Sequence, residues 1–148
     1  MTRSTTYSFP DINVWLAVVV ERHVLNRAAS AWWNQNQSDA IGFCRFTQLG
    51  LLRHLTNAAT MKGKPLTNRQ AWNTFEALQG DARVRFLPEW PSLDGLLKTY
   101  SDVNQAATNL WGDAYLAAYA AVNGATLVTF DKGFRRVQPK AQSALNGR

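Results

Sequence analysis

The sequence predicts an α/β fold, with a mainly parallel sheet covered by helices on both faces as three layers. Short apolar segments alternate along the chain with segments of helical spacing, which is typical of strand–helix units. The segment 126–130 (TLVTF) is β-branched and apolar on both faces, which suits a strand covered on each side. The length of 148 residues and the 46% hydrophobic content suit one domain over 1–148, with a core expected at about 7–138.

The first half of the chain is expected to form two strands, each followed by helix. Asp11 comes just after the first strand and can cap the next helix, because its carboxylate accepts hydrogen bonds from first-turn N–H groups. A second helical segment places Val24 and Trp32 on one face. The expected elements are a strand ending at 8–9, helices over 12–20 and 23–36, a strand over 40–44 and a helix over 45–55.

The second half repeats this alternation after a polar, glycine-containing loop at 57–65. Thr67 is suited to cap one helix, and Ser92 begins another. Gly124 suits the end of the last helix, because glycine reaches the left-handed conformation cheaply. The expected elements are a helix from 67 towards 80, a strand over 84–87, a helix from 92, a connection over 105–111, a helix opening at Asp113, a strand over 126–130, and a short strand near Val137 before a frayed end.

The charge balance points to a polyanionic partner. The formal net charge is +6, with eleven arginines and a pI near 9.9, which favours nucleic acid. The basic residues are spread along the chain, so a merely solvated basic surface stays open as the alternative. No apolar run reaches the roughly 18–20 residues that cross a bilayer. Because the N-terminus lacks the apolar stretch of a signal peptide, we expect a cytoplasmic protein.

Several kinds of site are excluded or disfavoured. Cys44 is the only cysteine, so an internal disulfide and a cysteine-based zinc site are excluded, and we expect a small buried residue. The six tryptophans are expected mainly in the core, although indole rings also stack on bases. We expect His23 and His54 to be structural or surface residues. The chain has no G-x-S-x-G elbow and no phosphate-binding glycine loop.

Three aspartates distant in sequence are expected at one edge of the sheet. Asp11 follows the first strand, Asp113 opens a helix and Asp131 follows the strand at 126–130. Helix N-termini and carboxyl ends of parallel strands share an edge, where open sheets bind ligands. Converging carboxylates repel one another unless a cation neutralises them, and oxygen ligands favour Mg²⁺ or Mn²⁺. Such an ion lowers the pKa of bound water and stabilises phosphoryl charge, as phosphodiester hydrolysis requires.

The motifs that carry these residues resemble a known family. The segments FPDINVWL, CRFTQLGLLRHLTN, WGDAYLAA and LVTFDKGF together resemble the PIN domain, and more narrowly the VapC-type ribonuclease toxins of bacterial toxin–antitoxin pairs. The resemblance covers about 9–137. It implies a Rossmann-like sheet, Mg²⁺- or Mn²⁺-dependent cleavage of RNA, a cognate antitoxin that covers the active-site groove, and a homodimer. It also implies metal-site roles for Asp11, Asp113 and Asp131, with Asn13 and Thr129 as supporting polar groups.

One position departs from the family pattern. The acid that the family usually carries in the helix after the second strand is replaced here by Gln48, beside Thr47. Glutamine keeps a carbonyl oxygen but removes a negative charge, so we expect weaker metal affinity and a Gln48 that reaches the ion through water or orients it. The main alternative is therefore a non-catalytic RNA-binding or adaptor module on the same scaffold. A structure-specific DNA nuclease is a third reading, although so short a chain leaves little room for the helical arch of those relatives.

Arginines are expected to bind the RNA backbone beside the acidic site. The candidates for phosphate contacts are Arg45, Arg53, Arg135 and Arg136, which would add salt-dependent affinity without sequence preference. The RNA target, the cleavage site, the number of metal ions and the antitoxin's identity are not encoded in any pattern that we find.

Overall fold

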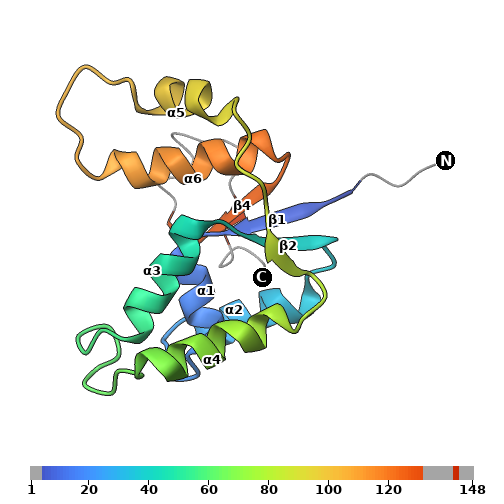
Figure 1. Ribbon diagram of the computed structural model, residues 1–148, viewed down its shortest axis with the longest axis vertical. Coiled ribbons are helices and arrows are strands. Elements are labelled where there is room, and N and C mark those ends of the chain that lie inside the picture. Colours follow the sequence, from blue (N-terminus) through green and yellow to red (C-terminus); the bar gives the residue numbers. More distant parts are fainter. Residues whose placement is uncertain (1–4, 132–141, 144–148) are drawn as a thin grey trace.

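A five-stranded sheet forms the centre of the molecule in the computed structural model. The structure describes residues 5–131 and the backbone of 142–143. The strands lie in the order β3-β2-β1-β4-β5, and each of the four pairings between them is parallel. Crossovers on both sides of β1 put helices on both faces of the sheet (Figure 1). The predicted three-layer α/β class is therefore confirmed.

The strands are short and the helices carry most of the chain. The strands are β1 (Tyr7–Pro10), β2 (Ala40–Phe43), β3 (Val84–Phe86), β4 (Thr126–Thr129) and β5 (Gln142–Ser143). The helices are α1 (Ile12–Val19), α2 (Asn26–Gln35), α3 (Arg45–Leu55), α4 (Asn68–Gln79), α5 (Leu93–Ser101) and α6 (Leu110–Val122). The strand expected near Val137 falls outside the described residues, and within the end expected to be frayed Gln142–Ser143 form β5.

The two faces of the sheet bury separate clusters. On one face Phe9 of β1 and Leu127 of β4 pack with α5 and α6, and Phe9 stacks on Tyr119 with ring centroids 5.2 Å apart. On the other face Ile41 and Phe43 of β2 pack with α1, α3 and α4 around the buried Trp15. The strands are thus apolar on both sides, as the sequence predicts. Figure 1 shows α5 and α6 above the sheet and α1 to α4 below it.

Most of the buried residues of helix α6 are alanines, with Leu116 and Tyr119 as the larger ones. Five of its residues on the buried side are alanine or leucine: Ala114, Leu116, Ala117, Ala118 and Ala120. Methyl groups let a helix backbone lie close to the strands beneath it, because little side-chain volume separates them. The helix therefore carries its first turn, with Asp113, close to the sheet edge.

The local signals at helix ends are confirmed. The Asp11 carboxylate accepts a hydrogen bond from the Val14 N–H at 3.1 Å and so caps α1. Thr67 caps α4 in a reciprocal pair with Gln70, each side chain accepting from the other's backbone N–H. Gly124 follows α6 with a φ of 63°, in the left-handed region that favours glycine.

Three expectations are wrong. Helix α6 begins at Leu110, so 105–111 is only in part a connection and Asp113 lies within the first turn rather than at the entrance. Helix α2 begins at Asn26, after a turn, and Val24 is 78% exposed rather than on a buried face. The tryptophans divide evenly: three are buried or half-buried, whereas Trp72, Trp90 and Trp111 are about half exposed or more.

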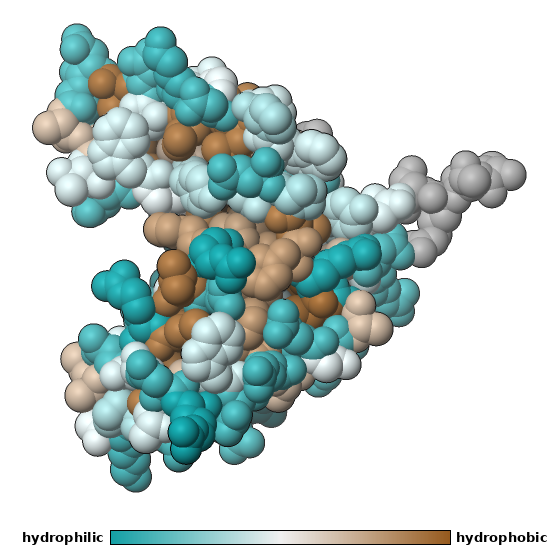
Figure 2. Space-filling model, in the orientation of Figure 1, coloured by the Kyte–Doolittle hydropathy of each residue, from teal (hydrophilic) through white to brown (hydrophobic). Residues whose placement is uncertain are grey.

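A broad hollow separates the α5–α6 layer from α3 and α4. Figure 2 shows it in the space-filling view, with apolar residues gathered on its floor between two largely hydrophilic lobes. Apolar side chains at the start of α3 are exposed in this region, Phe46 to 43% and Leu49 to 51%. In the part of the chain that the structure describes, no helix is long and apolar enough to span a bilayer.

Candidate functional site

The first turns of α1, α3 and α6 gather at the carboxyl ends of the strands. In the β1–β2 pairing Ser8 lies opposite Ile41, so continuing that register by three residues places Asp11 opposite Cys44, which precedes α3. The Phe46 ring reaches across to α6, where it meets Tyr115 edge-on at 5.6 Å between centroids. A Cβ at Gly112 would lie 3.6 Å from the Phe46 ring, an ordinary van der Waals contact, so the ring lies beside the first turn of α6. The start of α3 therefore touches α6 through the Phe46 side chain.

Asp11 is the buried acid of this edge. Its side chain is only 6% exposed, and both carboxylate oxygens accept hydrogen bonds. One accepts from the Val14 N–H, and the other accepts from the Thr129 hydroxyl at 2.5 Å. The backbone N–H of Asp11 donates to the carbonyl of Val128 at 3.0 Å, which ties the end of β1 to β4. The carboxylate is thus fixed at the junction of two neighbouring strands.

The pKa of Asp11 shows that this position disfavours negative charge. Burial raises it from 3.8 to about 6, against the hydrogen bonds from Thr129 and Val14, which favour the ionised form. The negative charges of Asp113 and Asp131 raise it further. Asp11, from the start of the chain, therefore lies within the electrostatic reach of two acids more than a hundred residues away. A cation beside these groups would reverse each of the unfavourable effects.

Asp113 and Asp131 come from two different elements, α6 and the end of β4, and both act electrostatically on Asp11. Asp113 is half-buried in the first turn of α6, and Asp131 is exposed two residues after β4. Thr129 links Asp131 to Asp11: its hydroxyl donates to the Asp11 carboxylate and accepts from the Asp131 N–H at 2.9 Å. The threonine, itself 2% exposed, thus orients the acid at the end of β1 and the backbone at the end of β4.

Gln48 and Thr47 lie in the first turn of α3, and both are buried. The Thr47 hydroxyl accepts from the Cys44 N–H at 3.0 Å and donates to the Cys44 carbonyl at 3.0 Å, so it serves the start of the helix. The Gln48 carbonyl oxygen already accepts a hydrogen bond from the Arg45 guanidinium. Cys44 is buried, as expected, and burial raises the pKa of its thiol.

The other residues selected from the sequence are exposed, lie farther from Asp11, or fall outside the described residues. Asn13 is exposed on the first turn of α1. Arg53 lies eight residues after Arg45 in α3, about 12 Å farther along the helix axis, and therefore away from this edge. Arg135 and Arg136 lie outside the described residues. The aromatic neighbours of the edge, Phe86 beside Arg45 and Tyr115 beside Phe46, were missed, because no sequence pattern marks an exposed ring as a support.

The donor set fits a hard divalent ion in chemical type. The groups that converge here are carboxylate and hydroxyl oxygens, which suit Mg²⁺ or Mn²⁺ rather than zinc. Burial is the main cause of the raised pKa of Asp11, and the negative charges of Asp113 and Asp131 add to it. Within residues 5–131, however, no three acidic, histidine or cysteine side chains are near enough to form a closed ligand cage. Such an ion would therefore be held partly through its water shell.

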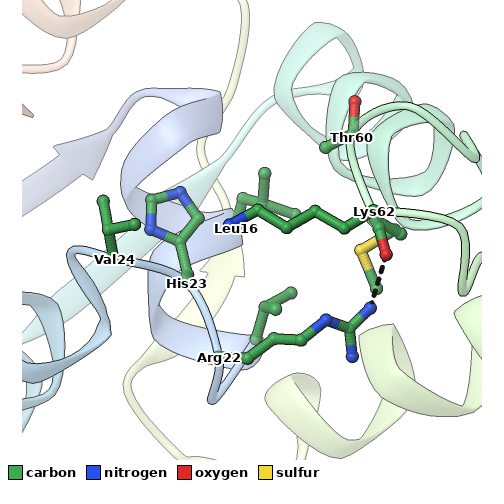
Figure 3. A pocket seen from close by; sticks show the side chains of 8 residues that line it. Leu16, Arg22, His23, Val24, Thr60 and Lys62 are labelled. Atoms are coloured by element: carbon green, nitrogen blue, oxygen red, sulfur yellow. Dashed lines mark hydrogen bonds between the residues drawn. The ribbon is translucent and has the colours of Figure 1, made fainter.

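A separate pocket lies away from these acids. It is formed by the end of α1, the following turn and the loop after α3, and its lining side chains include Arg22, His23 and Lys62 but no carboxylate (Figure 3). The Arg22 guanidinium donates to the Met61 carbonyl at 2.8 Å. Burial and the nearby Lys62 lower the pKa of His23. The basic lining of this pocket is unsuited to a metal cation.

Comparisons with known proteins agree with this arrangement. Residues 8–139 match the family model of the PIN domain. Ribonuclease VapC41 of Mycobacterium tuberculosis (strain CDC 1551 / Oshkosh) is 40% identical over 129 residues, which cover 84% of this chain and 88% of that protein, and its counterpart in strain ATCC 25618 / H37Rv matches equally. VapC ribonuclease Mb2897 of Mycobacterium bovis (strain ATCC BAA-935 / AF2122/97) is 30% identical over 102 residues, 68% of each chain.

Proposed function

This chain belongs to the PIN-domain family as a VapC-type ribonuclease, and on that premise we propose that it is a metal-dependent endoribonuclease, the toxin of a type II toxin–antitoxin pair. The observation that carries the proposal is Asp11: a buried carboxylate with its pKa raised to about 6, held by Thr129 and under the fields of Asp113 and Asp131. We take residues 1–148 as one nuclease domain with its core at about 7–138.

The residues of the edge divide the work of phosphodiester cleavage. Asp11, Asp113 and Asp131 would hold Mg²⁺ or Mn²⁺, directly or through water, with Thr129 fixing the Asp11 carboxylate and Asn13 nearby. Such an ion supplies an acidified water molecule and charge stabilisation at the phosphoryl group. The chain itself binds the RNA backbone through arginines and keeps the buried acid in one orientation. His23 and His54 have no part in this scheme, since burial lowers the pKa of both and each lies at the far end of its helix or beyond it.

The partners follow from the same surface. The relatives are named as VapC ribonucleases, which supports RNA as the substrate and a cognate antitoxin as the partner. An acidic edge invites an arginine from the antitoxin, which would compete with the metal for the carboxylates. The exposed apolar side chains Phe46, Leu49 and Trp111 offer area for an antitoxin helix and for a second copy in a homodimer. We assign the protein to the cytoplasm.

Cleavage of RNA by the purified chain tests the proposal directly. Asp113→Asn should abolish RNA cleavage in Mg²⁺ or Mn²⁺ while leaving the circular dichroism spectrum unchanged, because asparagine keeps the size and shape of this half-buried side chain. Asp94→Asn is the control, since Asp94 is likewise an acid in the first turn of a helix, α5, but is exposed. Equal cleavage by the two variants would refute the role of Asp113.

The non-catalytic adaptor is the second candidate, and Gln48 is the observation that favours it. Its carbonyl oxygen accepts a hydrogen bond from Arg45. The position where the family usually has an acid therefore carries no negative charge, and its oxygen is already bonded within the protein. Calorimetry separates the two functions. A nuclease should bind Mn²⁺ in a way that Asp11→Asn weakens, whereas a decayed site should show no aspartate-dependent binding at about millimolar metal.

A further inference from the structure

Arg45 is an arginine held in place without a counter-charge. Its guanidinium lies over the Phe86 ring, 5.0 Å from the centroid, and donates to the carbonyl oxygen of Gln48. Among the described residues no carboxylate lies within ion-pair distance of it. A cation–π contact and an amide fix the position of a guanidinium but leave its full charge for a ligand.

A second ring-stacked arginine shows what a structural role looks like in this fold. Arg83 lies over the Trp33 ring at 4.6 Å, but it forms an ion pair with Asp81 at 2.8 Å and donates to the carbonyls of Trp33 and Asn36. All sides of that guanidinium are used within the protein. Arg45 has the same stacking without the acid, so its charge is directed outward.

The place of Arg45 relative to the acids sets which phosphate it can reach. It is the first residue of α3, directly after the residue opposite Asp11, and it leans over Phe86 of β3. Strand β3 is two strands from β1, about 10 Å across the sheet. A group at that distance suits a neighbouring phosphate along the RNA rather than the one under attack.

We propose that Arg45 binds an RNA backbone phosphate next to the scissile bond, and that Gln48 and Phe86 are the residues that position it. This inference rests on the proposed nuclease function. It also gives a role to the neutral residue at position 48. A glutamate there would form an ion pair with Arg45 one turn earlier in the helix and cancel the charge that RNA needs. Gln48 keeps the hydrogen bond and leaves the arginine cationic.

The test measures RNA binding apart from cleavage. A fluorescent single-stranded RNA oligonucleotide is titrated with the full chain in chelator, at several salt concentrations, with the RNA checked for integrity. Arg45→Gln should weaken binding about fivefold near 0.1 M salt and lower the salt slope by about 0.7, the contribution of one phosphate contact. Arg85→Gln is the matched control, because Arg85 is also exposed and lies over the Tyr7 ring at 5.7 Å, on the opposite face of β3 from Phe86.

A second variant tests the positioning role of Gln48. Gln48→Glu should weaken RNA binding, because the new carboxylate pairs with the Arg45 guanidinium and cancels its charge. The double variant lowers the net charge by two and leaves that carboxylate unpaired, so it should bind RNA more weakly than either single variant. Unchanged RNA affinity in Gln48→Glu would overturn its part of the proposal.

The outcomes separate this inference from the nuclease function. If the wild type binds RNA through Arg45 but makes no Asp113-dependent cuts, the proposed function fails and the phosphate contact stands. If the wild type cuts RNA while Arg45→Gln and Arg85→Gln bind alike, the role of Arg45 is refuted and the nuclease stands. A wild type without measurable RNA binding in chelator would overturn the role of Arg45, and the cleavage assay would still decide the nuclease function.

Discussion

The two edges of the sheet treat their charged groups differently. At the amino ends of the strands, the Asp39 carboxylate accepts from the Thr6 N–H at 2.8 Å, and Asp81 pairs with Arg83. At the carboxyl ends, Asp11 is buried beside other acids and Arg45 has no acid within reach among the described residues. Charged groups that are paired within the protein stabilise the fold. A buried acid with a raised pKa, or an arginine without an ion pair, is a candidate to bind a ligand. The contrast favours the carboxyl ends of the strands as the functional edge.

The pKa of Asp81, at the amino ends of the strands, is shifted in the opposite direction from the pKa of Asp11, at the carboxyl ends. The hydrogen bonds from Arg83 lower the pKa of Asp81, so the folded state favours its charge. Burial raises the pKa of Asp11 to about 6, so the folded state disfavours its charge. Removing each charge should therefore shift stability in opposite directions, and the following experiments test this and related differences, beginning with the largest effect.

The largest effect should come from Asp11→Asn in metal-free protein. An acid with a folded pKa of about 6 and an ordinary value of 3.8 stabilises the fold fully below pH 3.8, and that contribution is lost as the pH rises through about 6. The loss is up to about 3 kcal/mol. Urea unfolding in chelator should find Asp11→Asn more stable than the wild type near pH 8 and similar near pH 4. Parallel pH profiles for the two proteins would contradict the assignment.

A divalent ion should offset the destabilisation by the ionised Asp11 carboxylate in the wild type, but should have little effect on Asp11→Asn. Mn²⁺ at about 100 times its dissociation constant should stabilise the wild type by about 2.7 kcal/mol near pH 8, because it binds only the folded chain. Thermal unfolding with and without Mn²⁺ measures the difference. Asp11→Asn should show little shift, and Asp81→Asn should shift as much as the wild type. An equal shift in both variants would place the ion elsewhere.

Thr129→Val should affect activity more than stability. The hydroxyl that joins Asp11 to the Asp131 backbone is removed at nearly constant volume. Residues that orient metal ligands typically account for about 10–100-fold in activity or metal affinity. Steady-state cleavage of RNA is the measurement, with Thr129→Ser as the variant that keeps the hydroxyl and should recover most of the rate. Failure of serine to recover it would assign the loss to packing.

Asp81→Asn should have the smallest effect and no influence on RNA. The Asp81–Arg83 pair is partly exposed, at 29% and 25% of the side-chain areas, so its loss should cost about 1 kcal/mol and less at high salt. Chemical unfolding at low and high salt measures this. Cleavage should match the wild type, and a reduced rate would mean that the two edges are coupled.

Much of the fold and of the candidate edge could be predicted because the signals are local. Alternating apolar segments and cap residues such as Asp11 and Thr67 are written in short stretches, and parallel topology then brings the strand ends together. The predicted start of α6 is wrong because its N-cap residue, Asn109, makes no side-chain capping bond, while Asp113 is an acid in the first turn and resembles a cap in the sequence. The pairing of Arg45 with Phe86 joins elements far apart in the chain, and periodicity says nothing of such contacts. The raised pKa of Asp11 depends on burial, which appears only once the layers are packed.

The alanine-lined underside of α6 has a consequence for how this edge can be adjusted. Ala114 and Ala117 are fully buried, so the position of α6, and with it the position of Asp113, depends on these side chains staying small. A larger side chain at either position would displace the whole helix, because the surrounding core is closely packed. Substitutions at these two buried alanines should therefore change the distance between Asp113 and Asp11, although neither alanine is exposed to solvent.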